Sequence, residues 1–194
     1  DDPAVIDHPL FSWMDCDCTD PREVSDTFDR VVRDHGAIDL YVANAGQARY
    51  TCAVALPDDD IRMMTDLNML AVMRAFRLMK GFHQDRPFAF VAISSVMAYW
   101  PLPGYAAYSA TKAAVMAYIK GIRHELVKGQ RAHLVYPVAT KTGFFKVSGQ
   151  KHPSPMIQTP EHVASTIVKG ILKGKNDIHP SGLFRITHAV MPWA

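Results

Sequence analysis

Three side chains that could exchange a proton with a carbonyl or an alcohol lie close together in the sequence: Ser95, Tyr108 and Lys112. Ser95 follows an apolar run over 88–93, which we interpret as a strand. Tyr108 and Lys112 share one face of a predicted helix, because they are four residues apart. Lowering a phenol pKa by about three units requires about 4 kcal/mol, which one ammonium at roughly 4 Å supplies at an effective dielectric constant of about 20. Lys112 is therefore expected to make Tyr108 an acid/base, with Ser95 hydrogen-bonded to the substrate oxygen.

Taken alone, the Tyr–Lys pair also suits a surface tyrosine and a solvated lysine on an ordinary helix. Two further motifs favour chemistry, Ala43-Asn44-Ala45-Gly46 and Leu67-Asn68-Met69. Together with Ile93-Ser94-Ser95 and the Tyr108–Lys112 pair, they resemble the short-chain dehydrogenase/reductase family. The resemblance runs from Asp15 to about Pro180 and implies one Rossmann-type domain over residues 1–194.

This resemblance implies a catalytic role for four residues. Ser95 would orient the substrate and Tyr108 would exchange the proton. Lys112 would lower the Tyr108 pKa and bind the nicotinamide ribose. Asn68 would hold a water in the proton relay. The reaction would move hydride between a nicotinamide cofactor, NAD or NADP, and a carbonyl or secondary alcohol.

The resemblance also implies a cofactor site. Asp17 and Cys18 would meet the adenine, and Asn44, Ala45 and Gly46 would support the adenosine side and the central sheet. The segment after the predicted strand Ala132–Tyr136 would line the nicotinamide site, through Pro137, Val138, Thr140 and Thr142. Two positions depart from the family pattern: Val138 stands where Gly is usual, and Ala43 where a first Asn is frequent.

Strands and helices are predicted to alternate along the chain. The expected strands are Pro9–Cys18, Ile38–Ala43, Phe88–Ile93 and Ala132–Tyr136. The first helix follows an Asp20 cap, with Pro21 at its first position, Glu23 completing a capping box and Gly36 at its end. Further helices are expected over Asp58 to about Lys80, Ala106–Val127 and Thr159 to Gly174. Alternation predicts a doubly wound parallel sheet with three α/β/α layers, and ligands beyond the carboxyl ends of the strands.

Nothing before Asp15 matches the Gly-rich turn that brings backbone N–H groups and a helix N-terminus to a pyrophosphate. We therefore expect the opening βαβ segment of the fold to be missing and the chain to be part of a longer protein. The residue that would select NAD or NADP belongs to that segment, so the choice stays open.

Composition narrows the class of protein. The chain has 194 residues, 48% of them hydrophobic, and a net charge of +2. It contains no basic run typical of nucleic-acid binding, and no apolar stretch near the roughly 20 residues that span a bilayer. Three cysteines make no disulfide framework, which favours a reduced, cytoplasmic setting. The histidines and cysteines have no metal-ligand spacing, so no metal site is predicted.

Two other functions compete with the oxidoreductase. Ser109-Ala110-Thr111-Lys112 and Lys141-Thr142-Gly143 match two signatures of penicillin-binding serine enzymes. That reading fails because S-D-N is absent and only 28 residues separate the two lysines. The second alternative is a catalytically inactive relative that senses a dinucleotide or acts as a scaffold.

Substrate and assembly are predicted more coarsely. Tyr99, Trp100, Leu102 and Tyr105, with Phe144, Phe145 and Val147, suggest an apolar substrate pocket, although these aromatics also suit simple packing of a loop. A homodimer or homotetramer is expected by resemblance, through the helices at Asp58–Lys80 and Ala106–Val127. The small side chains of Ala107, Ala110, Ala114 and Ala117 would permit close helix contact there.

Overall fold

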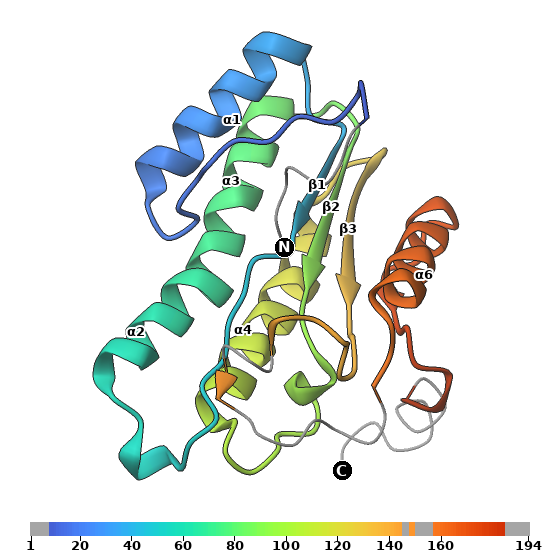
Figure 1. Cartoon of the computed structure of the whole chain (residues 1–194). Helices are drawn as coiled ribbons and strands as arrows, with labels where there is room; N and C mark the ends of the chain where they lie inside the picture. The colour runs from blue at the N-terminus through green and yellow to red at the C-terminus, as the bar shows by residue number, and fades with distance from the viewer. Residues whose placement is uncertain (1–7, 145–147, 150–156, 185–194) are drawn as a thin grey trace.

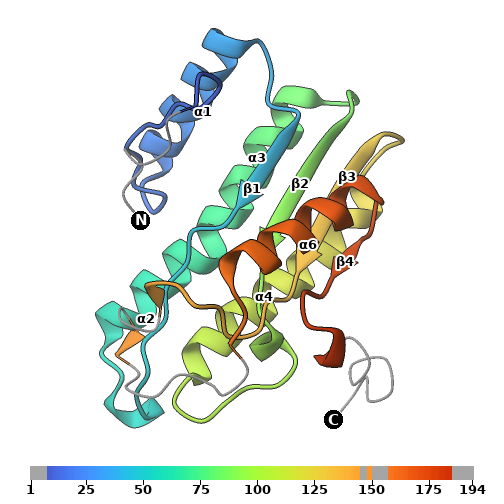
Figure 2. The same cartoon turned by 45° about the vertical axis from the view of Figure 1, so that its right-hand side comes forward.

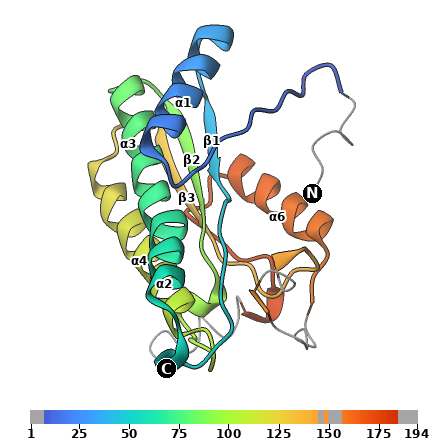
Figure 3. The ribbon, with the colours of Figure 1, turned by 60° about the vertical axis from the view of Figure 1, so that its left-hand side comes forward.

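The fold is a parallel sheet covered by helices on both faces, as predicted. A computed structural model describes residues 8–144, 148–149 and 157–184. The sheet has four strands in the order β1 (Leu40–Ala43), β2 (Phe88–Ile93), β3 (Gln130–Val135) and β4 (Asp177–Ile178). All three strand pairings are parallel. Helices α1 (Pro21–His35), α2 (Asp58–Thr65), α3 (Ala71–His83) and α4 (Ala106–Ile122) lie on one face, and α6 (Pro160–Leu172) lies on the other (Figures 1 and 3).

Alternation along β2 explains how the two layers of helices are held. Phe88, Phe90 and Ala92 belong to the core shared with α1, α3 and α4. Val91 instead belongs to a smaller cluster with Ile178 and the apolar side of α6. Successive side chains of a strand point to opposite faces, and a strand buried on both faces is therefore apolar throughout. This is why Phe88–Ile93 is readable as a strand from sequence.

The other face of β1 is open. Leu40 and Val42 are 44% and 45% exposed, because the cluster that includes α6 is formed with β2, β3 and β4 and contains no residue of β1 (Figure 2). In the described part of the chain β1 pairs with β2 alone. Among the described residues, β1 is consequently an edge strand with apolar side chains at its surface.

Helix α1 begins and ends where its local signals predict, with one difference. The Asp20 carboxylate accepts a hydrogen bond from the Arg22 N–H at 2.7 Å, and the Gly36 N–H donates to the Val32 carbonyl with φ at +83°. Glu23 does not complete a capping box, because its carboxylate accepts the Asp17 N–H at 2.8 Å. The Asp20 N–H donates instead to the Asp17 carbonyl.

The strand predicted over Pro9–Cys18 is wrong. Residues 11–17 are irregular, and no described strand pairs with them. An apolar run becomes a strand only if its N–H and C=O groups find a neighbouring strand. Leu10 and Trp13 remain 91% and 53% exposed.

The remaining boundaries differ in smaller ways. The helix predicted from Asp58 is interrupted by a π-helical turn, Asp66–Leu70, and continues as α3 to His83. Helix α4 stops at Ile122, before a 3₁₀ turn, Arg123–Glu125. Strand β3 begins two residues earlier than predicted, and β4 was not predicted. None of the described helices is long and apolar enough to cross a membrane.

Candidate active site

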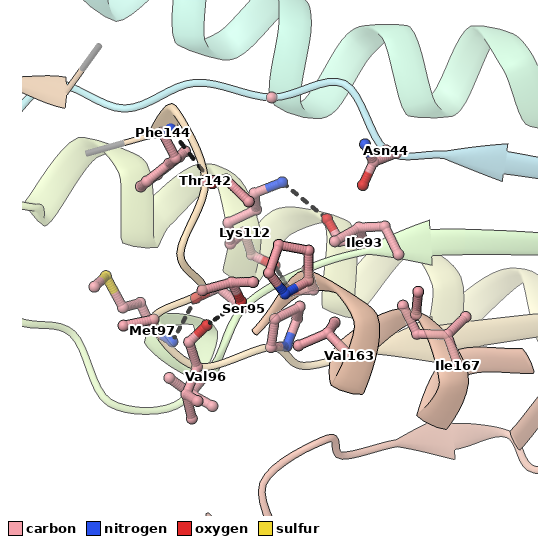
Figure 4. A pocket seen from close by; sticks show the side chains of 18 of the residues that line it. Asn44, Ile93, Ser95, Val96, Met97, Lys112, Thr142, Phe144, Val163 and Ile167 are labelled. Carbon is pink, nitrogen blue, oxygen red and sulfur yellow. Dashed lines mark hydrogen bonds between the residues drawn. The ribbon is translucent and has the colours of Figure 1, made fainter. Parts of the chain in front are cut away.

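A cavity of about 570 Å³ lies at the carboxyl ends of β1, β2 and β3. Its walls come from the segments that follow these strands, from α4, and from the first turns of α6 (Figure 4). Nine residues predicted to serve catalysis or cofactor binding line it: Asn44, Gly46, Ser95, Tyr108, Lys112, Pro137, Val138, Thr140 and Thr142. The topology thus brings together residues that are distant in the sequence, as expected for a sheet of this type.

Ser95 stands at the end of β2, where the strand turns into a short 3₁₀ helix, Val96–Ala98. Its hydroxyl oxygen accepts the Met97 N–H at 3.1 Å, which caps that helix. The Ser95 side chain also acts on the Tyr108 phenol, whose pKa it lowers. Because the Met97 N–H fixes the Ser95 hydroxyl near the Tyr108 phenol, the two side chains are placed to bind one substrate oxygen together.

Tyr108 and Lys112 lie on the inner face of α4, and both are buried. The Lys112 Nζ donates to the Ile93 carbonyl at 2.8 Å, and it lies 5.7 Å from the centroid of the Tyr108 ring. Figure 4 shows the lysine reaching from α4 toward the end of β2. Tyr108 and Lys112 are therefore neighbours in space, as their spacing predicts, and the ammonium is hydrogen-bonded to the Ile93 carbonyl.

The expected lowering of the Tyr108 pKa by Lys112 does not occur in the chain by itself. Burial raises the pKa of Tyr108 to about 12, against a smaller lowering by the Ser95 hydrogen bond. Burial also lowers the pKa of Lys112 to about 8. Loss of water disfavours the charged form of each group. Desolvation is therefore the largest influence on both pKa values, and the one that a spacing of four residues does not reveal.

Asn68 lies behind the cavity wall in the π-helical turn, fully buried. Its Oδ1 accepts the Gln47 N–H at 2.9 Å, and its Nδ2 donates to the Gln47 carbonyl at 2.9 Å and to the Thr111 hydroxyl at 3.0 Å. The side-chain amide is thus fully engaged. A relay water could therefore contact Asn68 only through its main-chain carbonyl. The π-helical turn that carries Asn68 is of a kind frequent at functional sites.

Gly46 separates Asn68 from Lys112. A Cβ at this position would lie 3.1 Å from the Asn68 Oδ1 and 3.2 Å from the Lys112 Nζ. Only a residue without a side chain lets the segment after β1 approach both groups without displacing them. Among its neighbours, Asn44 lines the cavity and Ala45 does not.

Asp17 and Cys18 are not part of the cavity wall. The Asp17 carboxylate accepts hydrogen bonds from the Thr19 hydroxyl and N–H, which lower the pKa of Asp17. Burial raises the pKa of the Cys18 thiol. Cys16, Cys18 and Cys52 are free thiols. The adenine contact predicted for Asp17 and Cys18 stays a prediction.

Of the residues predicted to form an apolar pocket, Phe144 lines the cavity. Tyr99, Trp100, Leu102 and Tyr105 do not line it. Tyr105 packs against Tyr108, and Trp100 against Phe184. Those aromatics pack the loops, the alternative left open by the sequence. Phe145 and Val147 lie outside the described residues. The apolar wall is made by Ile93, Val96, Met97, Phe144, Val163 and Ile167.

Three polar residues that support the site were not assigned a role from sequence. The buried Ser94 hydroxyl donates to the Lys112 carbonyl at 2.9 Å and ties β2 to α4. Thr111 and the Gln47 backbone hold Asn68. Ser94 and Thr111 stand beside the recognised Ser95 and Lys112, so adjacency was the available signal. Gln47 acts through its backbone, which no residue type reveals.

Comparisons with known proteins agree on one family. A family model described as short chain dehydrogenase matches residues 7–153. A curated oxidoreductase of Myxococcus xanthus is 28% identical over 145 residues, which are 74% of this chain and 56% of the relative. The chain spans about half the length of the curated relatives it matches first.

Solved structures share the fold. A short chain dehydrogenase from Burkholderia cenocepacia in complex with NADP superimposes with a TM-score of 0.82 at 20% identity, over 97% of this chain and 76% of the other. A short chain dehydrogenase/reductase from Burkholderia phymatum in complex with NAD gives 0.79 at 17% identity, over 91% and 74%.

Proposed function

Because the chain belongs to the short chain dehydrogenase family, we propose that it is an NAD(P)-dependent oxidoreductase that acts on a carbonyl or a secondary alcohol. The observation that supports this most is the meeting of Ser95, Tyr108 and Lys112 on the wall of one cavity. These residues come from the end of β2 and from one face of α4. A phenol, a hydroxyl and an ammonium in one buried site are the groups that proton transfer at a carbonyl oxygen needs.

The residues present fit a nicotinamide cofactor. Gly46 leaves a space that a Cβ would fill between Asn68 and Lys112. The cavity next to it is lined by Asn44 and Lys112 on one side and by Pro137, Val138, Thr140 and Thr142 on the other. We assign the nicotinamide half of NAD or NADP to these residues. Asn44 and Gly46, expected from the sequence on the adenosine side, are thereby reassigned, because they line the same cavity as Lys112. Asp17, Cys18 and Ala45 stay assigned to the adenosine side. When bound, the cofactor supplies or accepts the hydride.

Tyr108 is the proposed acid in the reducing direction. Its pKa of about 12 keeps the phenol protonated at neutral pH, so the residue enters the reaction carrying the proton it must give. Ser95 holds the substrate oxygen through its hydroxyl, beside the phenol. Tyr108 would give its proton to the substrate oxygen as negative charge develops there.

Lys112 is the proposed source of the next proton. Its ammonium has a pKa of about 8, well below the value of about 12 for Tyr108. Proton transfer from the ammonium toward a tyrosinate is therefore favourable. The Nζ donates to the Ile93 carbonyl and lies 5.7 Å from the centroid of the Tyr108 ring, and we propose that a water held near the main-chain carbonyl of Asn68 completes the relay.

The proposed substrate is a bulky, mainly apolar carbonyl compound. Met97 and Phe144 flank the catalytic residues, and the Phe144 ring lies 5.5 Å from that of Tyr108. Val163 and Ile167 of α6 close the far side (Figure 4). An apolar wall with a few polar groups at one end is typical of small-molecule sites.

The test begins with fluorescence titrations of the chain with NADPH and with NADH. Reduction of a panel of aryl and branched alkyl ketones is then measured with the cofactor that binds. Tyr108→Phe should bind cofactor as the native chain does and lose turnover, because only the phenolic oxygen is removed. Tyr118→Phe, on the same helix but outside the cavity, is the matched control and should keep activity. Full activity in Tyr108→Phe would refute the assignment, and cofactor binding without any turnover would favour a sensing role.

A further inference from the structure

A buried chain of hydrogen bonds connects three segments behind the cavity. Asn68 binds the Gln47 backbone through both its amide oxygen and its amide nitrogen. The second amide hydrogen of Asn68 goes to the Thr111 Oγ1 at 3.0 Å. The Thr111 hydroxyl in turn donates to the Tyr108 carbonyl at 2.7 Å. Thr111 therefore joins the π-helical turn to the part of α4 that carries the proposed acid.

The direction of each bond follows from the chemistry of the groups. A hydroxyl carries one proton, and the Thr111 proton is directed at a carbonyl, which only accepts. Its oxygen must then accept from Asn68, which orients the amide with its NH₂ toward α4. Asn68 is 0% exposed and Thr111 is 7% exposed. Water is poorly placed to replace either partner, and an unpaired buried N–H is costly.

The link bears on the active site through Gly46. The Asn68 Oδ1 and the Lys112 Nζ both lie just beyond the position of a Gly46 Cβ, at 3.1 and 3.2 Å. A shift of the Asn68 amide moves the segment that carries Gly46, because the amide holds the next residue, Gln47, by two hydrogen bonds. That segment then presses on Lys112 or withdraws from it.

We propose that Thr111 is a positioning residue, whose hydroxyl sets the spacing between the turn of Asn68 and the turn of α4 that carries Tyr108 and Lys112. This proposal rests on the proposed function for its effect on turnover. The structural part of the proposal, the coupling of Thr111 to Asn68, depends only on the hydrogen bonds described above.

Thr65 provides a matched comparison on the same layer of helices. Its hydroxyl also donates to a carbonyl one turn earlier, that of Ile61 at 2.8 Å. Such bonds are common for threonines in helices. Thr65 has no side-chain bond to Asn68, so Thr65→Val removes the local bond without touching the network.

The experiment compares Thr111→Val, Thr111→Ser and Thr65→Val in the native chain. We expect kcat to fall roughly ten- to a hundredfold in Thr111→Val with KM within about twofold, because misplacement of reacting groups affects the chemical step. The pH profile of kcat should shift as well. Thr111→Ser restores the hydroxyl and should recover most of the rate, whereas Thr65→Val should behave as the native chain.

A readout without turnover tests the coupling directly. The side-chain amide of Asn68 gives a pair of signals in an NMR spectrum of ¹⁵N-labelled protein, assigned by their loss in Asn68→Asp. These signals should move in Thr111→Val and stay in place in Thr111→Ser and Thr65→Val. If Thr111→Val does not fold, Thr111→Ala replaces it in every comparison.

The outcomes separate the two claims. Unchanged Asn68 signals, or a native kcat and pH profile in Thr111→Val, would overturn the positioning role. Loss of rate in Thr111→Ser equal to that in Thr111→Val would also overturn it, because the hydroxyl would not be the cause. Shifted Asn68 signals in a chain that reduces no carbonyl would support the coupling while the proposed function failed.

Discussion

The buried ammonium of Lys112 predicts an unusual dependence of stability on pH. Burial lowers the pKa of Lys112 from 10.5 to about 8 in the folded chain. Between these values the unfolded chain binds a proton that the folded chain has released, so the free energy of unfolding rises with pH across this window. The full difference is about 3 kcal/mol, at about 1.36 kcal/mol for each pH unit. This contribution is present above pH 10.5 and is lost as the pH falls through 8.

Lys112→Met isolates this contribution, because methionine occupies a similar volume and does not titrate. Urea unfolding is measured for both chains from pH 7 to pH 10.5, and the free energy of the variant is subtracted from that of the native chain. The loss of the hydrogen bond to the Ile93 carbonyl offsets the whole difference curve but does not bend it. Tyr108 destabilises both folded chains above pH 10, since its pKa of about 12 is raised, and this effect cancels in the subtraction.

The difference should rise by about 3 kcal/mol between pH 8 and pH 10.5. A matched control, Lys120→Met, removes an exposed lysine of the same helix, and the rise for Lys112→Met is read against its curve. A flat curve for Lys112→Met would show that the buried lysine keeps an ordinary affinity for its proton. The proposed transfer of a proton from Lys112 to Tyr108 would then lose its basis.

Three further predictions address the cofactor site, the core and assembly. Gly46→Ala should weaken cofactor binding roughly tenfold, because its Cβ meets Asn68 and Lys112 at 3.1 and 3.2 Å. Gly121→Ala, with open space around it, should bind the cofactor normally. Equal cofactor affinities in the two variants would contradict the assignment of Gly46 to the cofactor site. Phe90→Ala should lower the free energy of unfolding by about 3–5 kcal/mol, since the ring is fully buried between Tyr41 and Phe76, and a loss below about 1 kcal/mol in urea unfolding would count against this core. Ala110→Lys should dissociate the expected homodimer or homotetramer in sedimentation velocity, because Ala110 is exposed on α4; an unchanged sedimentation coefficient would place the interface elsewhere.

The sequence predicted structure correctly where residue type and spacing within one segment decide its conformation. The run Phe88–Ile93 forms β2 with the predicted bounds, because a strand buried on both faces must be apolar at every position. Asp20, Pro21 and Gly36 delimit α1 through bonds made within a few residues. The four-residue spacing of Tyr108 and Lys112 sufficed to place both on one helix face.

The differences arose where contacts outside the local pattern, or the lack of a partner, decided the structure. The run over Pro9–Cys18 has the composition of a strand and finds no partner strand in the described part of the chain. Glu23 suits a capping box, yet its carboxylate takes the Asp17 N–H. Tyr99, Trp100 and Tyr105 pack their loops, whereas Met97, which was not predicted, lines the cavity together with the predicted Phe144.

The sequence by itself determined the layered α/β class and most helix and strand positions, and it predicted Ser95, Tyr108 and Lys112 as the chemical centre, since these depend on residue type and short spacing. Only the tertiary structure decided the protonation of that centre and its support. Burial raises the pKa of Tyr108 and lowers that of Lys112, and Asn68 is held by Gln47 and Thr111 from two other segments. Desolvation and long-range hydrogen bonds depend on what surrounds a group in space, which its neighbours along the chain do not specify.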